Sequence, residues 1–79
     1  MQEELIQFIQ EVVLEGKEAR ISADTLLFKE QLLDSMNILH LIGYVEHKLN
    51  RRLADEEIVM SNFRSVRAIA NAFFDERDD

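Results

Sequence analysis

Apolar residues recur at spacings of three and four near the start of the chain. They are Leu5, Phe8, Ile9, Val12 and Val13. Residues at these spacings lie on one face of an α-helix, so they form an apolar stripe that can face a core. Gly16 follows the stripe and is a typical residue at a helix C-terminus. The pattern predicts an amphipathic helix over about residues 3–15.

The helical period is lost between residues 17 and 34, although this stretch is rich in large apolar residues. They are Leu26, Leu27, Phe28, Leu32 and Leu33. Side chains of this kind are seldom left in water together. We therefore expect a long loop that packs across the core, rather than a free linker.

A second helix is predicted over residues 35–49. Its apolar residues Ile38, Ile42, Val45 and Leu49 fall in one arc of a helical wheel, with Leu39 and Leu41 at the borders. Asn50 suits a C-terminal cap of this helix. The basic residues near this end complement the negative end of the helix dipole, and they are Lys48, Arg51 and Arg52.

Two further helices complete the prediction. Carboxylates at residues 55–57 suit the start of a short helix over 56–63. A last helix is expected over 66–74, on the apolar stripe Val66, Ile69, Ala70, Phe73 and Phe74. Residues 75–79 are expected to form an acidic, frayed end. Strand-like alternation, hairpin signals and repeats are lacking. The expected fold is a single all-α domain over 1–79, a four-helix bundle with a long packed loop between its first two helices and a short third helix.

Composition narrows the class of protein. The chain has 79 residues, no cysteine, 47% hydrophobic residues and a formal net charge of −7. The negative charge argues against nucleic-acid binding, which needs clustered basic residues. No apolar run approaches the roughly 18 residues that a membrane span requires, so we expect no membrane insertion. The start Met1-Gln2-Glu3-Glu4 is acidic where a signal peptide is basic. We therefore expect a cytoplasmic monomer.

Helix geometry decides which of the candidate catalytic and metal-binding side chains can meet. Ser35, His40 and Asp34 suggest a hydrolase triad, but His40 lies about 140° round the helix from Ser35 and cannot reach its hydroxyl. His40 and His47 share a face, yet they stand roughly 10 Å apart along the axis, too far to bind one metal ion. Glycine-rich phosphate loops are also missing. We expect neither an enzyme nor a metal site.

The run Leu32-Leu33-Asp34-Ser35-Met36 resembles the attachment motif of the acyl carrier protein family. The likeness includes the stretch Leu41-Ile42-Gly43-Tyr44-Val45-Glu46 and the pair Ser65-Val66 before the last helix, and it covers most of the chain. Within the family, the chain is most similar to D-alanyl carrier proteins and other free-standing aminoacyl carriers. The Asp-Ser-Met triplet alone is weak support, because such triplets occur by chance in roughly one in twenty chains of this size.

The resemblance implies a covalent cofactor. A phosphopantetheinyl transferase would attach 4′-phosphopantetheine from coenzyme A to Ser35, and Asp34 would help that enzyme to place its metal ion and basic groups. An acyl- or aminoacyl-loading ligase would then charge the arm's thiol as a thioester. A downstream acyltransferase or synthase would take the cargo. The identity of the cargo stays open, with an aminoacyl group favoured by the resemblance.

Ser35 also suits a phosphate for a physical reason. A helix N-terminus offers unpaired backbone N–H groups and the positive end of the dipole. The simpler alternative is that Asp34 or Ser35 is an ordinary N-cap. A capping box is not expected, because Asn37 and Ile38 stand where Glu or Gln would complete one.

The outer face of the second helix is a candidate surface for partner docking. It consists of Met36, Asn37, His40, Gly43, Tyr44 and His47. Met36 suits a contact with differently shaped partners, or a half-buried start of the helix. Gly43 either allows close approach of a partner or is a tolerated surface glycine. Fatty-acid carriers of this family commonly present acidic residues here, so the uncharged face favours a dedicated set of partner enzymes. The alternative function is a helical protein-protein interaction module without a prosthetic group.

Overall fold

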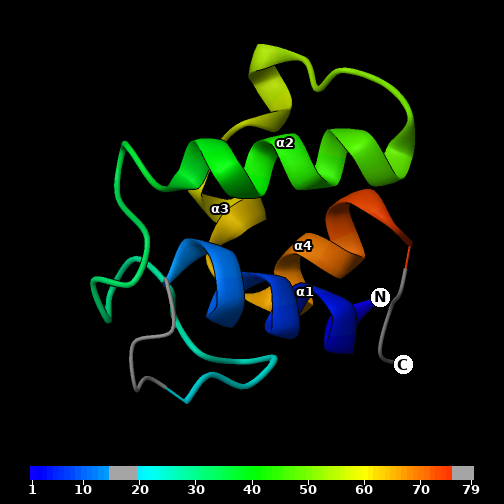
Figure 1. Cartoon of the computed structure of the whole chain (residues 1–79). Helices are drawn as coiled ribbons and strands as arrows, with labels where there is room; N and C mark the ends of the chain where they lie inside the picture. The colour runs from blue at the N-terminus through cyan, green and yellow to red at the C-terminus, as the bar shows by residue number, and fades with distance from the viewer. Residues whose placement is uncertain (15–19, 76–79) are drawn as a thin grey trace.

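The computed structural model describes residues 1–14 and 20–75. Its elements are α1 (Gln2–Phe8), a π-helical turn η1 (Ile9–Val13), α2 (Ile38–Leu49), a 3₁₀ turn η2 (Asp55–Glu57), α3 (Met60–Phe63) and α4 (Val66–Phe73). Every regular element in these two stretches is helical (Figure 1). The predicted all-α class is confirmed.

The helices surround one apolar core. α1 and α3 both contact α4, and η1 contacts α2. In the view of Figure 1, α2 lies above α1 and α4. Each α-helix and the loop contribute fully buried side chains, and the largest of these are Leu5, Leu27, Leu41, Phe63 and Ile69. The core therefore joins segments from the whole length of the described chain.

The first helix ends in a wider turn than predicted. The Leu14 N–H donates to the Ile9 carbonyl at 2.8 Å, a π-helical bond that spans five residues. The wider turn buries both Val13 and Leu14 and leaves Val12 exposed. The prediction that Val12 belongs to the buried stripe is therefore wrong. The predicted helix end at residue 15 and the stop at Gly16 lie outside the described residues.

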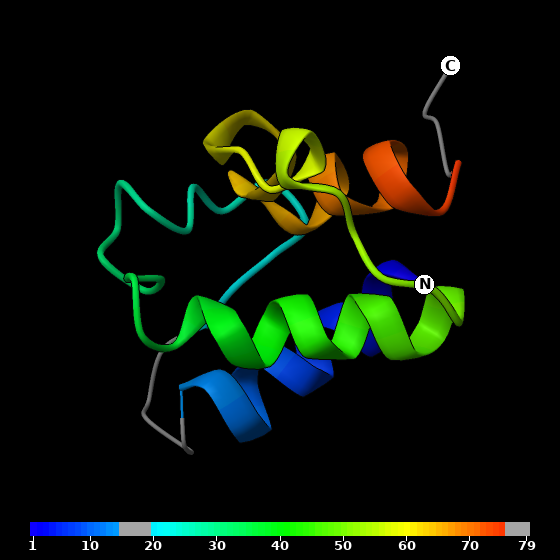
Figure 2. The ribbon, with the colours of Figure 1, turned by 90° about the horizontal axis from the view of Figure 1, so that it is seen from above.

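The loop between α1 and α2 crosses the core, as predicted. In Figure 2 its described part, from residue 20 onward, runs to the start of α4 and back to the start of α2. The Leu27 N–H donates to the Arg64 carbonyl at 2.8 Å, and the Arg67 N–H donates to the Ala23 carbonyl at 2.9 Å. Leu27 and Leu33 are buried. Leu26 departs from the expectation, because 43% of its surface remains exposed.

The second helix starts later than predicted and ends where expected. Regular α-helix begins at Ile38 rather than at residue 35, because the preceding turn holds shorter three-residue bonds such as His40 N–H to Asn37 carbonyl at 3.1 Å. Asn50 is the C-cap, with a left-handed φ of 56°. The core arc is centred on Leu41 and Val45, both fully buried, rather than on Ile42.

The third predicted helix is split in two. Ile58 and Val59 leave helical geometry, with ψ angles of 73° and 153°. The 3₁₀ turn η2 therefore precedes a separate single-turn helix, α3. The last helix begins at Val66 as predicted and stops one residue early, at Phe73. The Ser65 hydroxyl caps it by accepting the Ala68 N–H at 3.1 Å. Of the predicted acidic end, residues 76–79 lie outside the described part.

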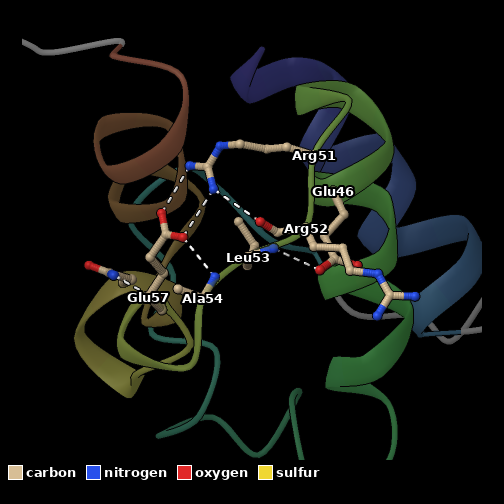
Figure 3. A network of polar contacts seen from close by, with 7 residues as sticks. Glu46, Arg51, Arg52, Leu53, Ala54 and Glu57 are labelled. Carbon is tan, nitrogen blue, oxygen red and sulfur yellow. Dashed lines mark hydrogen bonds and ion pairs between the residues drawn. The ribbon is translucent and has the colours of Figure 1, made fainter.

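Glu57 organises the connection between α2 and α3 (Figure 3). The Arg51 guanidinium donates to both oxygens of this carboxylate, at 3.0 and 2.9 Å, and the Ala54 N–H donates to Oε1 at 2.8 Å. The Leu53 N–H donates to Glu46 Oε2 at 2.8 Å. The carboxylates of Glu46 and Glu57 thus hold the backbone of Leu53 and Ala54 in place between α2 and η2. The sequence predicted only that Arg51 lies near the C-terminus of α2. The structure adds that its side chain forms an ion pair with Glu57.

This arrangement predicts a specific dependence of stability on pH. The hydrogen bonds from Arg51, and then that from Ala54, lower the pKa of Glu57 from 4.5 to about 2. A carboxylate with a lowered folded-state pKa stabilises the fold above its unfolded-state pKa, and this contribution is lost as pH falls through the folded-state pKa. We expect Glu57→Gln to lower the urea midpoint at pH 7 and to flatten its fall between pH 4.5 and about 2.

Glu56→Gln is the matched control, because it removes the same charge from the exposed neighbouring position. Urea midpoints measured at a series of pH values for the three proteins provide the comparison. A pH profile of Glu57→Gln parallel to that of the wild type would contradict the assigned role of this ion pair.

Candidate functional site

Ser35 lies exposed in the turn that leads into α2. The residue before it shapes this turn, because Asp34 Oδ1 accepts the N–H groups of Met36 and Asn37, both at 2.8 Å. Asn37 completes the arrangement. Its Oδ1 accepts the Asp34 N–H at 2.8 Å, and its Nδ2 donates to the Leu32 carbonyl at 2.9 Å. The serine hydroxyl is therefore presented from a turn that side chains hold on both flanks.

These bonds correct two expectations from the sequence. Asp34 and Asn37 form a reciprocal pair equivalent to a capping box, with Asn37 in the position where Glu or Gln was thought necessary. The short amide suffices because the turn brings Asn37 close to the Asp34 backbone. The N–H groups of Met36 and Asn37 are consequently occupied. A phosphate on Ser35 would not find these two donors unpaired, as the sequence suggested.

The reciprocal pair predicts a measurable loss of stability. Asp34→Ala removes the acceptor for two backbone N–H groups, and we expect it to lower the free energy of unfolding by about 1 kcal/mol. Asp34→Asn keeps an oxygen acceptor and is expected to cost only a few tenths of a kcal/mol. Urea unfolding of both variants measures the difference. Equal losses in the two variants would show that the cap is not what Asp34 contributes.

An apolar groove of about 310 Å³ begins beside Ser35. Asp34 and Ser35 form part of its lining. The rest comes from the loop, the start of α2, the break before α3 and α3 itself, and consists of Phe28, Ile38, Ile58, Val59, Met60 and Phe63. The groove was not predicted, because the sequence indicated one continuous helix over 56–63. The run Ile58-Val59-Met60 was the available signal, since one helical face cannot bury three consecutive apolar residues.

The predicted docking face is only partly open to solvent. Met36 is 79% exposed, and His40, Gly43 and His47 are also exposed. Tyr44 contradicts the prediction. Its ring stacks on Phe8 with centroids 4.1 Å apart, so it joins α2 to α1 and is half-buried.

Two further residues change the picture of this face. Asn37 is half-buried, and its side chain is hydrogen-bonded to the backbone of Asp34 and Leu32. Leu39, placed at the border of the predicted core arc, is 66% exposed and lies three residues after Met36. Met36, in the turn before α2, and Leu39, in the first turn of α2, are thus exposed apolar side chains three residues apart. At Gly43 an added Cβ would meet nothing within 4 Å, so packing does not require a glycine there.

The described residues offer neither a metal site nor a membrane span. Across 1–14 and 20–75, no three His, Cys, Asp or Glu side chains gather in a way that could hold a metal ion. Nor does any helix in these stretches combine the length and the apolar character needed to cross a membrane.

Comparison with known proteins adds no family assignment. No protein-family model matches the chain, and no curated protein matches it. A functional hypothesis for this chain therefore rests on the residues around Ser35 and on their geometry.

Proposed function

We propose that this chain is a stand-alone carrier protein that holds acyl or aminoacyl groups on a 4′-phosphopantetheine arm attached to Ser35. The observation that carries the proposal is the exposed serine at the mouth of an apolar groove. A transferase needs access to the hydroxyl, and a long flexible arm gains from a nearby surface that shields its apolar parts from water. Ser35 meets both conditions.

The residues around Ser35 fit such an arm. Phe28, Val59 and Met60 offer apolar contacts for it, and the positive end of the α2 dipole lies next to the phosphate position. Asp34 already caps the turn, so it holds Ser35 in place independently of the arm. The arm itself would supply a thiol that carries the cargo as a thioester. The protein's own residues present the serine, shield the arm and contact partners.

The proposed partners follow from this chemistry. A phosphopantetheinyl transferase modifies Ser35, an acyl- or aminoacyl-loading ligase charges the arm, and a downstream acyltransferase or synthase takes the cargo. Met36 and Leu39 stand next to Ser35 and are proposed to contact these enzymes. The exposed part of the α2 face carries histidines and apolar groups. This chemistry favours dedicated partners over basic enzymes that recognise an acidic helix.

The direct test is the mass of the intact protein. The chain is incubated with coenzyme A and a broad-specificity phosphopantetheinyl transferase, beside a Ser35→Ala control. We expect the wild type to gain one phosphopantetheinyl group and the control to gain none. An unmodified wild-type chain, with a known carrier protein modified in the same reaction, would overturn the proposal.

A second candidate is an interaction module without a prosthetic group. The large exposed apolar side chains favour it, because Met36, Leu39 and Met60 are 79%, 66% and 65% exposed. Solvent-exposed apolar patches commonly mark protein contacts. The mass experiment separates the two candidates, since an interaction module would remain unmodified. In both cases we propose that the chain has no catalytic activity of its own.

A further inference from the structure

A second hollow lies on the surface next to the groove at Ser35. It has a volume of about 420 Å³ and lies between the turn at residues 26–30 and α3. Its lining consists of Leu26, Phe28, Lys29, Met60, Ser61 and Arg64. Phe28 and Met60 also line the groove at Ser35, but Ser35 itself does not reach this hollow. The two depressions are neighbours with different chemistry.

The walls of the second hollow are joined to each other by backbone hydrogen bonds. The Leu27 N–H donates to the Arg64 carbonyl at 2.8 Å and links the loop to the end of α3. Within the loop wall, the Glu30 N–H donates to the Leu26 carbonyl at 2.9 Å. In the other wall, Arg64 Nη1 donates to the Ser61 carbonyl at 2.8 Å. These bonds hold the two walls in place, so binding requires little ordering of the protein.

The charge at this hollow is opposite to that of the protein as a whole. The chain carries a formal net charge of −7, yet the lining includes Lys29 and Arg64 and no carboxylate. Three other described cations form ion pairs, Arg67 with Asp24, Arg51 with Glu57 and Lys48 with Glu4. No ion pair of this kind is formed by Lys29 or Arg64 with the described acidic side chains. Two cations therefore flank exposed apolar surface.

The openness of the hollow indicates what kind of molecule covers it. Small ligands usually occupy pockets that bury most of their surface. Here Leu26 and Met60 remain 43% and 65% exposed, so a small ligand in the hollow would keep part of its surface in water. A side chain projecting from a larger surface can fill such a hollow, while the surrounding surface excludes water. The shape thus favours a protein partner, and the charge favours an acidic one.

We propose that this hollow docks a segment of a partner protein in which an apolar side chain is flanked by a carboxylate. The apolar side chain packs between Leu26, Phe28 and Met60, and the carboxylate pairs with Lys29 and Arg64. This surface is separate from the outer face of α2. The proposal does not depend on modification of Ser35.

The experiment uses a synthetic peptide as the probe. The peptide has about 15 residues, blocked ends, and an amphipathic pattern with leucines on one face bordered by glutamates. Its matched form has glutamine in place of every glutamate. Binding to the ¹⁵N-labelled chain is followed by NMR at low salt, where exposed charge pairs are least screened. We expect amide shifts centred on Leu26, Phe28 and Ser61, and about three- to fivefold tighter binding of the glutamate peptide.

Variants of the chain identify the groups responsible. Lys29→Gln combined with Arg64→Gln should make the two peptides bind equally. The control, Arg20→Gln with Arg52→Gln, removes the same charge from exposed positions outside the hollow and should keep the preference. Leu26→Asn should weaken both peptides alike, because Leu26 contributes apolar surface. Circular dichroism and the urea midpoint show that each variant is folded.

Several outcomes would overturn the proposal. Equal affinity of the two peptides for the wild type would remove the role of charge. Shifts centred on Met36 and Leu39 would move the docking site to α2. Shifts that depend on protein concentration without peptide would assign the hollow to a second copy of the chain. Octanoate binding at the hollow more tightly than the glutamate peptide would assign it to a small amphiphilic carboxylate.

Discussion

Ser35→Ala is expected to abolish phosphopantetheine transfer completely, with no mass gain even after prolonged incubation with coenzyme A and the transferase. The reason is chemical, because the proposed arm would be joined through the hydroxyl oxygen that alanine lacks. The same substitution should leave stability within about 0.5 kcal/mol of the wild type. Ser35 is exposed, and its hydroxyl makes no hydrogen bond with the described residues. Intact mass and urea unfolding measure the two quantities.

Ser61→Ala provides the matched control, because Ser61 is also an exposed serine that lines a surface hollow. It should gain the arm at the wild-type rate. Ser65 is unsuitable, since its buried hydroxyl caps α4 and its loss would change the fold's stability. Modification of Ser35→Ala would place the arm on another residue and contradict the assigned attachment site. Loss of modification in Ser61→Ala would point to a general structural effect.

Asp34→Asn extends this test to the neighbouring carboxylate. The amide keeps the oxygen that accepts the N–H groups of Met36 and Asn37, so the turn should persist. Slower modification of this folded variant would therefore reveal a role for the Asp34 charge in recognition by the transferase. An unchanged rate would limit Asp34 to capping the turn.

The class of fold could be predicted because its signal is repeated along the chain. The stripe of α4 and the C-terminal cap at Asn50 each depend on local sequence, and both lie where expected. The packed loop was also predictable, since Leu27 and Leu33 had no other place to be buried. Periodicity and burial are properties that neighbouring residues determine together. Where helical periodicity and the expected burial pointed to the same structure, as in α4 and the packed loop, the predicted element was confirmed.

The predicted bounds of the helices are wrong where local hydrogen bonds depart from the regular α-helical pattern. The turn after the Asp34 cap contains three-residue bonds, such as that from the His40 N–H to the Asn37 carbonyl, so regular α-helix starts at Ile38. Glu57 accepts the Ala54 N–H and anchors Arg51, and the chain leaves helical geometry at the next two residues. Such bonds depend on the exact position of one carboxylate or amide, which composition and periodicity do not encode.

The groove at Ser35 illustrates the consequence for function. Ser35 could be proposed as the attachment site from its local motif alone. The groove could not, because Phe28 and Met60 are far apart in the chain and meet only after the predicted third helix is broken. A local motif therefore indicates Ser35 as a candidate, while the surface that surrounds Ser35 depends on tertiary structure.

Phe63→Ala is expected to have the largest effect on stability. Phe63 is fully buried at the end of α3, and its ring lies 5.3 Å from that of Phe73 in α4. Phenylalanine-to-alanine changes in a core cost about 3–5 kcal/mol, because the lost burial and the remaining cavity both act against the fold. A chain of 79 residues has a total stability of roughly 4–12 kcal/mol. This single change can therefore remove most of it.

Phe63→Leu keeps the measurement informative if the alanine variant does not fold. Leucine fills most of the volume and should cost about 1–2 kcal/mol. Phe74→Ala is the control for an aromatic residue that is only half-buried, and it should cost less than Phe63→Ala. Urea unfolding at neutral pH measures all three. Losses below 1 kcal/mol for both Phe63 variants would contradict the core position of α3, on which the shape of the Ser35 groove depends.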